Sequence, residues 1–251
     1  MSRDSIEIRV RADRVEFRDA AAGSAAVGVL AGYAAVYERL SQNLGGFVEK
    51  VAHGAFAQSL ADNNPVLARY NHDDNQLLGT TEAETLRVSS DETGLPYDVD
   101  LPDTSVGRDV AVLAKRGDVR YSSFAFRTLE DAWSVTDQGF PLRTLLKVQL
   151  VDVAPVNNPA YRDTSVGMRS LAERTGIDPA DLTTVGVEEI RARLLKDAAE
   201  RAEQDAGDLG DTRSLLGLRK RALEQDPALS LNDWLRQPGR AGRVEDPERR
   251  I

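Results

Sequence analysis

The sequence contains no cysteine, and this absence removes several kinds of chemistry at once. Without thiols, a chain of 251 residues forms no disulfide, no thiolate metal site and no cysteine nucleophile. Only two histidines are present, so a histidine-rich zinc site is not expected. We therefore expect no metal and no cofactor. An intracellular setting fits a chain that lacks disulfides.

Long apolar runs and a net positive charge are also missing. No run approaches the roughly 20 apolar residues that a membrane span needs. The first residues, Met-Ser-Arg-Asp-Ser-Ile-Glu-Ile, are charged and have no apolar core of signal-peptide length. The formal charge is -9, from 32 basic and 41 acidic side chains, which argues against a protein built to bind phosphate backbones. We expect a soluble protein with neither a membrane nor a nucleic acid as partner.

Aromatic residues are scarce in the last third of the chain. Of the 14 Phe, Tyr and Trp residues, only Trp234 lies beyond position 170. Because aromatic side chains supply much of a core, we predict a compact domain over residues 1–170. Residues 171–236 are rich in Ala, Leu, Arg and Glu at helical spacing, which predicts a helical, scaffold-like extension. Residues 237–251 are polar with Gly and Pro and are predicted to be disordered.

The extension carries one apolar stripe, formed by Val187, Ile190, Leu194 and Ala198. Such a stripe is buried only by docking on another surface. Two partners remain open from the pattern, either a scaffold helix or one side of the preceding domain.

Residues 1–170 consist mainly of β-rich runs separated by turns. The predicted strands or hairpins are residues 6–17, 27–37, 66–70, 86–101, 119–126 and 142–156. The clearest helix is residues 104–116, which Asp103 or Thr104 can cap and which stops at Gly117. Many strands with a few short helices predict an α+β, mainly β fold: a closed or nearly closed barrel flanked by short helices.

The segment Gly117-Asp-Val-Arg-Tyr-Ser-Ser-Phe-Ala-Phe126 places two hydroxyls on a strand directly after that helix. A serine between aromatic residues is usually an ordinary strand residue, and the pattern does not fix the face that Ser123 uses. Ser123 becomes a nucleophile only if a base takes its proton, and histidine is the usual base.

Two histidines and one carboxylate are candidates to support a serine nucleophile. His72 lies at the end of a predicted strand, and His53 lies in a loop. Asp152 interrupts an apolar run, where a carboxylate is costly to bury unless something pairs with it. A cluster of acids could instead bind magnesium or calcium, although it matches no twelve-residue calcium loop. These acids are Asp73, Asp74, Asp98, Asp100 and Asp103.

Five segments in one order resemble a known family over roughly residues 28–169. They are Gly32-Tyr-Ala-Ala-Val-Tyr37, Gly54-Ala-Phe56, Asn71-His-Asp73, the serine segment, and Asp152-Val-Ala-Pro-Val-Asn-Asn-Pro-Ala-Tyr161 with Asp163-Thr164. Together they are similar to the prohead, or capsid-maturation, proteases of tailed bacteriophages, which are related in fold to the herpesvirus assemblin serine proteases. Each segment is short, and their shared order makes the resemblance specific.

The resemblance implies a serine endopeptidase with Ser123 as nucleophile, His72 as general base and Asp152 as the acid that orients the histidine. In this family the substrates are the scaffold or delta segment of the major capsid protein and the protease itself. The resemblance further implies a homo-oligomer that acts inside an immature phage head in the bacterial cytoplasm.

The chain departs from the family pattern at several positions. Tyr121-Ser122 replace the usual small residue and methionine, Ala125 replaces a glycine, and Asp152 replaces a glutamate. His53 stands where proline is common. These departures keep two alternatives open, an inactive head-assembly or scaffolding protein that retains the fold, and a β-barrel module that binds a peptide or small ligand.

Overall fold

The computed structural model describes residues 5–158 and 165–208. It divides into two compact units, Met1–Leu195 and Lys196–Ile251, and every strand found in the described residues lies in the first. The predicted disordered tail, residues 237–251, lies outside the described residues. So do the last residues of the segment that begins at Asp152, from Pro159 to Thr164.

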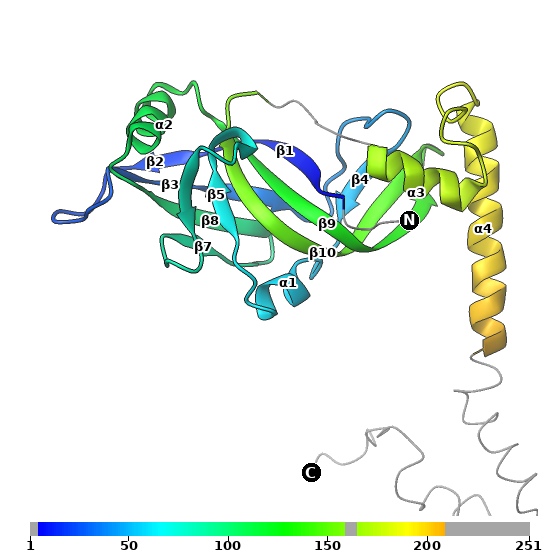
Figure 1. Ribbon diagram of the computed structural model, residues 1–251. Coiled ribbons are helices and arrows are strands. Elements are labelled where there is room, and N and C mark those ends of the chain that lie inside the picture. Colours follow the sequence, from blue (N-terminus) through cyan, green and yellow to red (C-terminus); the bar gives the residue numbers. More distant parts are fainter. Residues whose placement is uncertain (1–4, 159–164, 209–251) are drawn as a thin grey trace, which may run out of the picture. The chain divides into compact units, whose positions relative to one another are not determined.

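The first unit is built on two β-sheets (Figure 1). One has the order β1 (Glu7–Arg14), β9 (Tyr121–Val135), β10 (Pro141–Val156), β5 (Leu67–Arg69), β6 (Leu77–Thr80), and β4 (Val48–Val51) also pairs with β10. The other has the order β2 (Glu16–Arg18), β3 (Gly28–Val36), β8 (Gly94–Leu101), β7 (Leu86–Val88). The predicted β-rich runs all carry strands, so the mainly β class is confirmed.

The predicted closed or nearly closed barrel is not confirmed, because neither sheet closes on itself. Among the described residues, the first sheet ends at β1 and β6 and the second at β2 and β7. The chain passes from the first sheet to the second between β1 and β2, where the register of β1 shifts between Arg11 and Arg14. Such a register shift bends a strand. A local sequence pattern does not show which sheet the chain joins after the bend.

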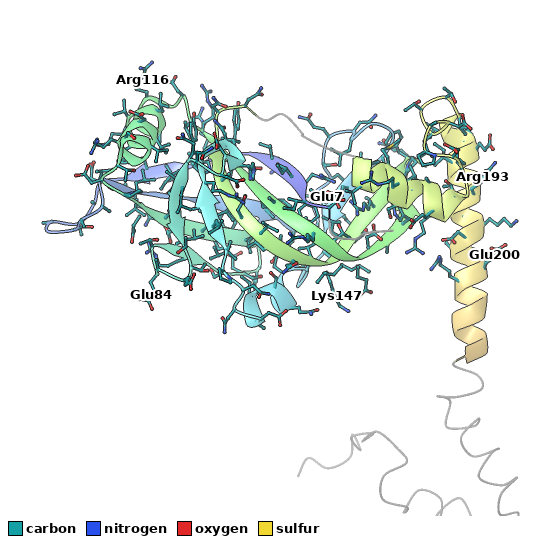
Figure 2. All side chains as sticks on the ribbon, in the orientation of Figure 1. Glu7, Glu84, Arg116, Lys147, Arg193 and Glu200 are labelled. Carbon is teal, nitrogen blue, oxygen red and sulfur yellow. The ribbon has the colours of Figure 1, made fainter. Side chains whose placement is uncertain are left out.

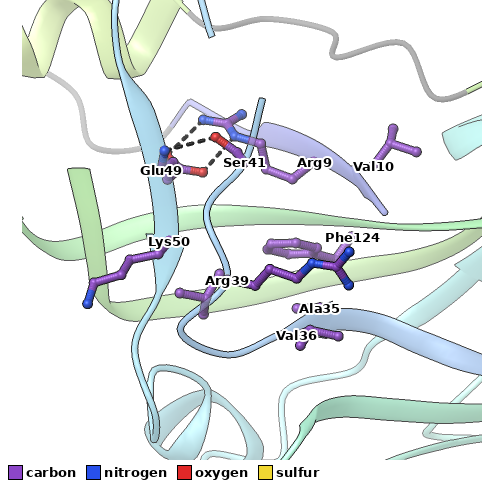
Figure 3. A pocket seen from close by; sticks show the side chains of 10 residues that line it. Arg9, Val10, Ala35, Val36, Arg39, Ser41, Glu49, Lys50 and Phe124 are labelled. Atoms are coloured by element: carbon purple, nitrogen blue, oxygen red, sulfur yellow. Dashed lines mark hydrogen bonds and ion pairs between the residues drawn. The ribbon is translucent and has the colours of Figure 1, made fainter. Parts of the chain in front are cut away.

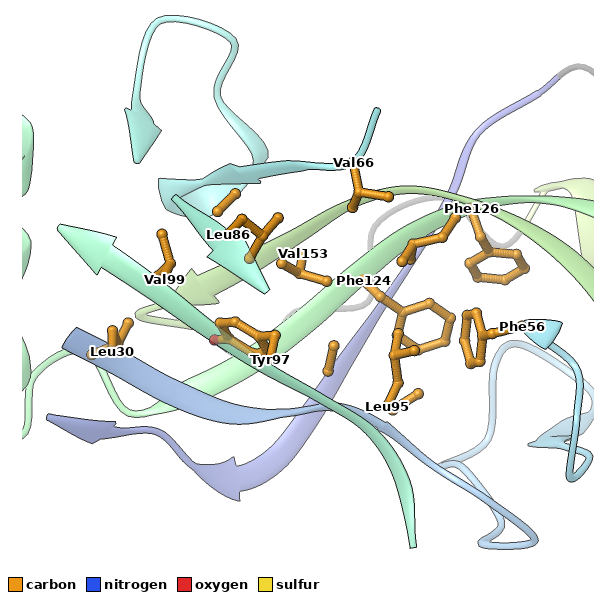
Figure 4. Packing of buried hydrophobic residues seen from close by; sticks show 14 of the residues in the cluster. Leu30, Phe56, Val66, Leu86, Leu95, Tyr97, Val99, Phe124, Phe126 and Val153 are labelled. Carbon is orange, nitrogen blue, oxygen red and sulfur yellow. The ribbon is translucent and has the colours of Figure 1, made fainter. Parts of the chain in front are cut away.

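The core between the sheets fixes which way the side chains of β9 face. Phe124 stacks on Phe126 with ring centroids 5.0 Å apart, and Phe56 packs edge-on against Phe124 (Figure 4). Successive side chains on a strand point to opposite faces. Ser123 and Ala125 therefore lie on the face of the first sheet that points away from this core.

Helix α2 (Ser105–Arg116) leads directly into β9, as the sequence predicts. The Thr104 side chain accepts a hydrogen bond from the Gly107 backbone N–H at 3.3 Å and caps its start. Gly117 follows its end with φ 85°, a conformation that glycine adopts without steric cost. The helix start and stop thus set where β9 begins.

A second apolar cluster joins the sheets to the helices that follow them. Phe47 and Trp133 pack edge to face, with ring centroids 5.1 Å apart. Residues of α3 (Ser165–Thr175), α4 (Val187–Asp208) and the segment between them bury side chains against this pair. They are Leu171, Ala172, Ile177, Leu182, Ile190 and Leu194.

The apolar stripe of the extension is buried only in part. Ile190 and Leu194 are buried in the second cluster, whereas Val187 and Ala198 are exposed. The first compact unit accordingly continues to Leu195. Within residues 5–158 and 165–208, no helix is long and apolar enough to cross a membrane.

Candidate active site

Ser123 lies in the first half of β9 and is 0% exposed. Its partner across the sheet is Val10 of β1 on one side and Ala154 of β10 on the other. The neighbouring hydroxyl of Ser122 faces the opposite way, into the core, where it lies 3.1 Å from the Tyr97 hydroxyl. Of the two adjacent serines, only Ser123 faces the other two predicted site residues.

His72 is presented by a tight 3₁₀ turn, Tyr70–His72, that directly follows β5. Asn71 and His72 both have positive φ, 54° and 59°. This left-handed conformation is uncommon for residues other than glycine and stores strain of about 1–3 kcal/mol per residue. The Asn71 side chain accepts a hydrogen bond from the Asn157 backbone N–H at 3.2 Å, which ties the turn to the end of β10. The turn therefore holds the imidazole against the sheet.

Asp152 lies on β10, and its side chain is almost fully buried. The backbone of β10 pairs with β9 at Ala125 and with β5 at Leu67, so Asp152 sits on a strand with a neighbour on each side. A buried carboxylate needs charged or hydrogen-bonding partners to offset its desolvation.

The three predicted residues converge through two short contacts. His72 Nε2 lies 2.5 Å from Ser123 Oγ, and His72 Nδ1 lies 2.5 Å from Asp152 Oδ1. With the proton on Nδ1, this N–H donates a hydrogen bond to the carboxylate and leaves Nε2 free to accept the proton of the serine hydroxyl. This order of groups is the one required to activate a serine.

Sequence reasoning missed Arg69, which holds the other oxygen of Asp152. Its Nη2 donates to Asp152 Oδ2, and its Nη1 donates to Asp74. The Nε of Arg69 is buried and, among the described residues, has no hydrogen-bond partner. The arginine lies only three positions before His72, yet its sequence neighbours give no sign of a carboxylate 83 positions further on.

A buried network of charged residues lies on the core face of the same sheet. Arg9 donates to Glu7 at 2.6 Å and to Glu49 at 2.7 Å, and Arg143 donates to both carboxylates at 2.8 and 3.0 Å. Arg143 also donates to Asp131 at 2.7 Å. Figure 2 shows Glu7 within the ribbon, whereas Glu84, Arg116 and Lys147 project from its periphery.

The charges within this network shift each other's ionisation. Burial alone would raise the pKa of Glu7, but the positive charges of Arg143 and Arg9 outweigh it and lower that pKa below its usual value. Burial alone would lower the pKa of Arg9, yet Glu49 and Glu7 raise it. Glu7 and Arg9 are therefore both charged at neutral pH.

The other candidates from the sequence do not join the serine. His53 is exposed, and its ring packs at 5.0 Å from the ring of Tyr37. Four of the five candidate metal-binding acids pair with arginines instead, and no group of three or more such ligands is arranged to hold a metal among the described residues. The pairs are Asp74 with Arg69, Asp98 with Arg18, Asp100 with Arg87 and Asp103 with Arg108.

Comparison with known proteins gives a class that agrees with this geometry. The sequence matches the family described as caudovirus prohead serine protease over residues 14–176, which is more than half of the chain. The chain belongs to this family.

A solved structure is also similar, that of the bacteriophage T4 capsid assembly protease, gp21. It has a TM-score of 0.43 and 12% sequence identity, and the match covers 60% of this chain and 96% of that one. No curated protein gives a significant match.

Proposed function

We propose that this chain is an active serine endopeptidase in which Ser123 is the nucleophile, His72 the general base and Asp152 the residue that orients the base. The observation that carries the proposal is the pair of 2.5 Å contacts on the two nitrogens of His72. Family membership supports protease chemistry, and the contacts name the residues that would perform it.

The expected reaction is an acyl transfer in two steps. Ser123 Oγ attacks the carbonyl carbon of the scissile peptide bond while its proton passes to His72 Nε2. The imidazolium, held by Asp152, then gives that proton to the nitrogen of the leaving amine. Water hydrolyses the resulting ester, again with His72 as base. Asp152 accepts a hydrogen bond from the Nδ1–H group throughout and stabilises the imidazolium.

The proposed substrates are the scaffold or delta segment of the major phage capsid protein and the chain itself. The family is a prohead protease family, so the proposed place of action is the immature head of a phage within the host cell. Assembly of several copies in that head makes a homo-oligomer the expected state.

Neighbouring serines offer a matched test of the nucleophile. Ser123→Ala is expected to leave a folded protein that no longer cleaves a capsid-protein precursor, because it removes one oxygen from a site whose packing is unchanged. Ser122→Ala removes the same oxygen one position away, on the core side, and is expected to remain active. Cleavage is followed on gels and folding by circular dichroism. Normal cleavage by the Ser123→Ala variant would contradict the proposed nucleophile.

The two histidines test the base in the same way. His72→Ala is expected to lower kcat by a factor of about 10³ or more, whereas His53→Ala, at an exposed loop position, should leave kcat nearly unchanged. Peptide hydrolysis rates of both variants measure this. If the unmodified chain cleaves no precursor at all, the alternative of an inactive head-assembly protein replaces the protease.

A further inference from the structure

The nucleophile strand is covered on one side by β1, the strand nearest the N-terminus. Val10 lies directly across from Ser123 and is itself 5% exposed. It forms a small apolar cluster with Tyr121 of β9 and with Ala154 and Val156 of β10. Because Ser123 is also completely buried, a peptide substrate cannot contact its hydroxyl in this arrangement. Some element beside Ser123 must move for catalysis.

Sheet position makes β1 the element best placed to move. Within the part of the chain that the structure describes, β1 is an edge strand with β9 as its sole sheet neighbour, whereas β10 is paired with β9, β5 and β4. The family match begins only at residue 14, the last residue of β1. The region matched to the family therefore includes only the last residue of this strand.

A backbone carbonyl of β1 also competes for the proton that catalysis needs. The Ser123 hydroxyl lies 2.9 Å from the carbonyl oxygen of Arg9 and can donate to it. The hydroxyl has a single proton, so donation to Arg9 prevents donation to His72 Nε2. A strand in this register thus presents a carbonyl where a substrate carbonyl would be needed and draws the proton away from the base.

The buried charges of β1 do not prevent its departure, because they form a neutral pair. Glu7 and Arg9 leave together, and the carboxylates that stay behind, Glu49 and Asp131, remain paired with Arg143 at 3.0 and 2.7 Å. Removing one partner of a buried ion pair is costly, but here neither of the two buried charges, Glu7 and Arg9, leaves without the other.

A small cavity of about 40 Å³ lies beside the same strand (Figure 3). It is lined by Arg9 and Val10 of β1, by Phe124 of β9, and by residues of β3, of β4 and of the loop between β3 and β4. Where β1 borders this partly open pocket, it lacks the close protein contacts that hold a fully packed strand.

We propose that β1 is an autoinhibitory strand that occupies the edge of β9 at which an extended substrate peptide pairs, so that β1 and substrate exclude each other. The inference rests on the proposed protease function and deepens it. The ligand is an extended polypeptide segment that adds to the sheet antiparallel to β9, with backbone hydrogen bonds providing most of its recognition. Displacement of β1 opens the edge and frees the Ser123 proton for His72.

A reversible tether tests this in the full chain. Ile8 and Ala125 are directly paired across β1 and β9, on the same row of side chains as Val10 and Ser123. Because the chain has no cysteine, Ile8→Cys with Ala125→Cys forms a single defined disulfide on oxidation. Peptide cleavage by the oxidised form is expected to be at least about tenfold slower than by the reduced form. Each single-cysteine variant cannot form the tether within the chain and should cleave the peptide at the same rate under oxidising and reducing conditions.

Binding of a labelled synthetic peptide of residues 5–14, measured by fluorescence anisotropy, separates this inference from the protease function. The reduced chain is expected to bind the peptide in exchange for its own β1, and the oxidised chain is not. If only the reduced form binds the peptide and neither form cleaves a substrate, the protease function is rejected and the strand exchange is retained. Equal cleavage in both forms, or peptide binding that is absent or unaffected by the tether, would overturn the autoinhibitory strand.

Discussion

Arg69 shows how a single side chain can decide the precision of the candidate site. Asp152 accepts from His72 through one carboxylate oxygen and from Arg69 through the other. An aspartate has fewer rotatable bonds than the glutamate typical of the family, and the arginine fixes the orientation of its short side chain. Arg69 touches neither Ser123 nor His72 through any described hydrogen bond, so we propose that it positions Asp152 and takes no direct part in the reaction.

Replacement of Arg69 should therefore affect the rate more than substrate binding. Arg69→Met keeps most of the apolar stem, removes the donors to Asp152, and is expected to lower kcat by about 10- to 100-fold with little change in KM. Arg69→Lys retains the charge without the planar pair of donors and should recover only part of the rate. Steady-state kinetics on a peptide substrate measures both values. Equal losses in an Arg87→Met control, which breaks an exposed pair with Asp100, would mean that the effect is not specific to the site.

At the scale of elements, the buried network joins four strands of the first sheet. Arg143 of β10 is 1% exposed and pairs with Glu7 of β1, Glu49 of β4 and Asp131 of β9. Arg143→Met leaves three carboxylates with less positive charge around them. We expect it to lower the free energy of unfolding by about 3–5 kcal/mol, because uncompensated buried charge is expensive. Urea denaturation measures this, and Arg87→Met, at an exposed pair, should cost less than about 1 kcal/mol.

The lowered pKa of Glu7 gives the network a pH dependence of known sign. A carboxyl whose pKa is lower in the folded than in the unfolded state adds stability above its unfolded pKa, near 4.5. That stability is lost as the pH falls through the folded value. The free energy of unfolding, obtained from urea denaturation at pH values from 6 down to 3, should therefore decline. One such group contributes a slope of up to about 1.4 kcal/mol per pH unit. Glu7→Gln, which cannot ionise, should give a shallower decline, and an unchanged slope would contradict the assignment.

Local structure was predictable from sequence wherever its cause is local. Helix α2 was found because its cap, Thr104, and its stop, Gly117, lie beside it in the chain. The site residues could not be assigned from the sequence pattern alone, which left open both the face of Ser123 and the choice of histidine. The family resemblance provided the assignment of Ser123 and His72. Arg69 and the contact of Ser123 with Arg9 were missed because both depend on strands that meet only in the fold. The open sheets in place of a barrel have the same origin.

For the molecule as a whole, the predicted division at residue 170 stays a prediction, and the second apolar cluster indicates how to test it. Leu171, Ile190 and Leu194 pack with Trp133 and belong to the first compact unit, which ends at Leu195. Each such side chain contributes about 1.5–3 kcal/mol when fully buried. A chain of residues 1–170 loses them and leaves Trp133 uncovered, whereas a chain of residues 1–195 keeps the cluster complete.

We expect the chain of residues 1–195 to unfold at nearly the same urea concentration as the full chain, and that of residues 1–170 to unfold at a clearly lower one. Equal midpoints for the two truncated chains would place the boundary at 170.

The proposed scaffold-like role of the extension then concerns residues 196–236, which should matter for assembly and not for chemistry. The chain of residues 1–195 is therefore expected to cleave a peptide at the full-chain rate in solution. It should nevertheless be absent from purified proheads when it replaces the full chain in an assembling phage, because it lacks the segment that would bind the scaffold. Its incorporation at the full-chain level would show that the extension has no part in packaging, and a loss of peptide cleavage would show that residues beyond Leu195 support the active site.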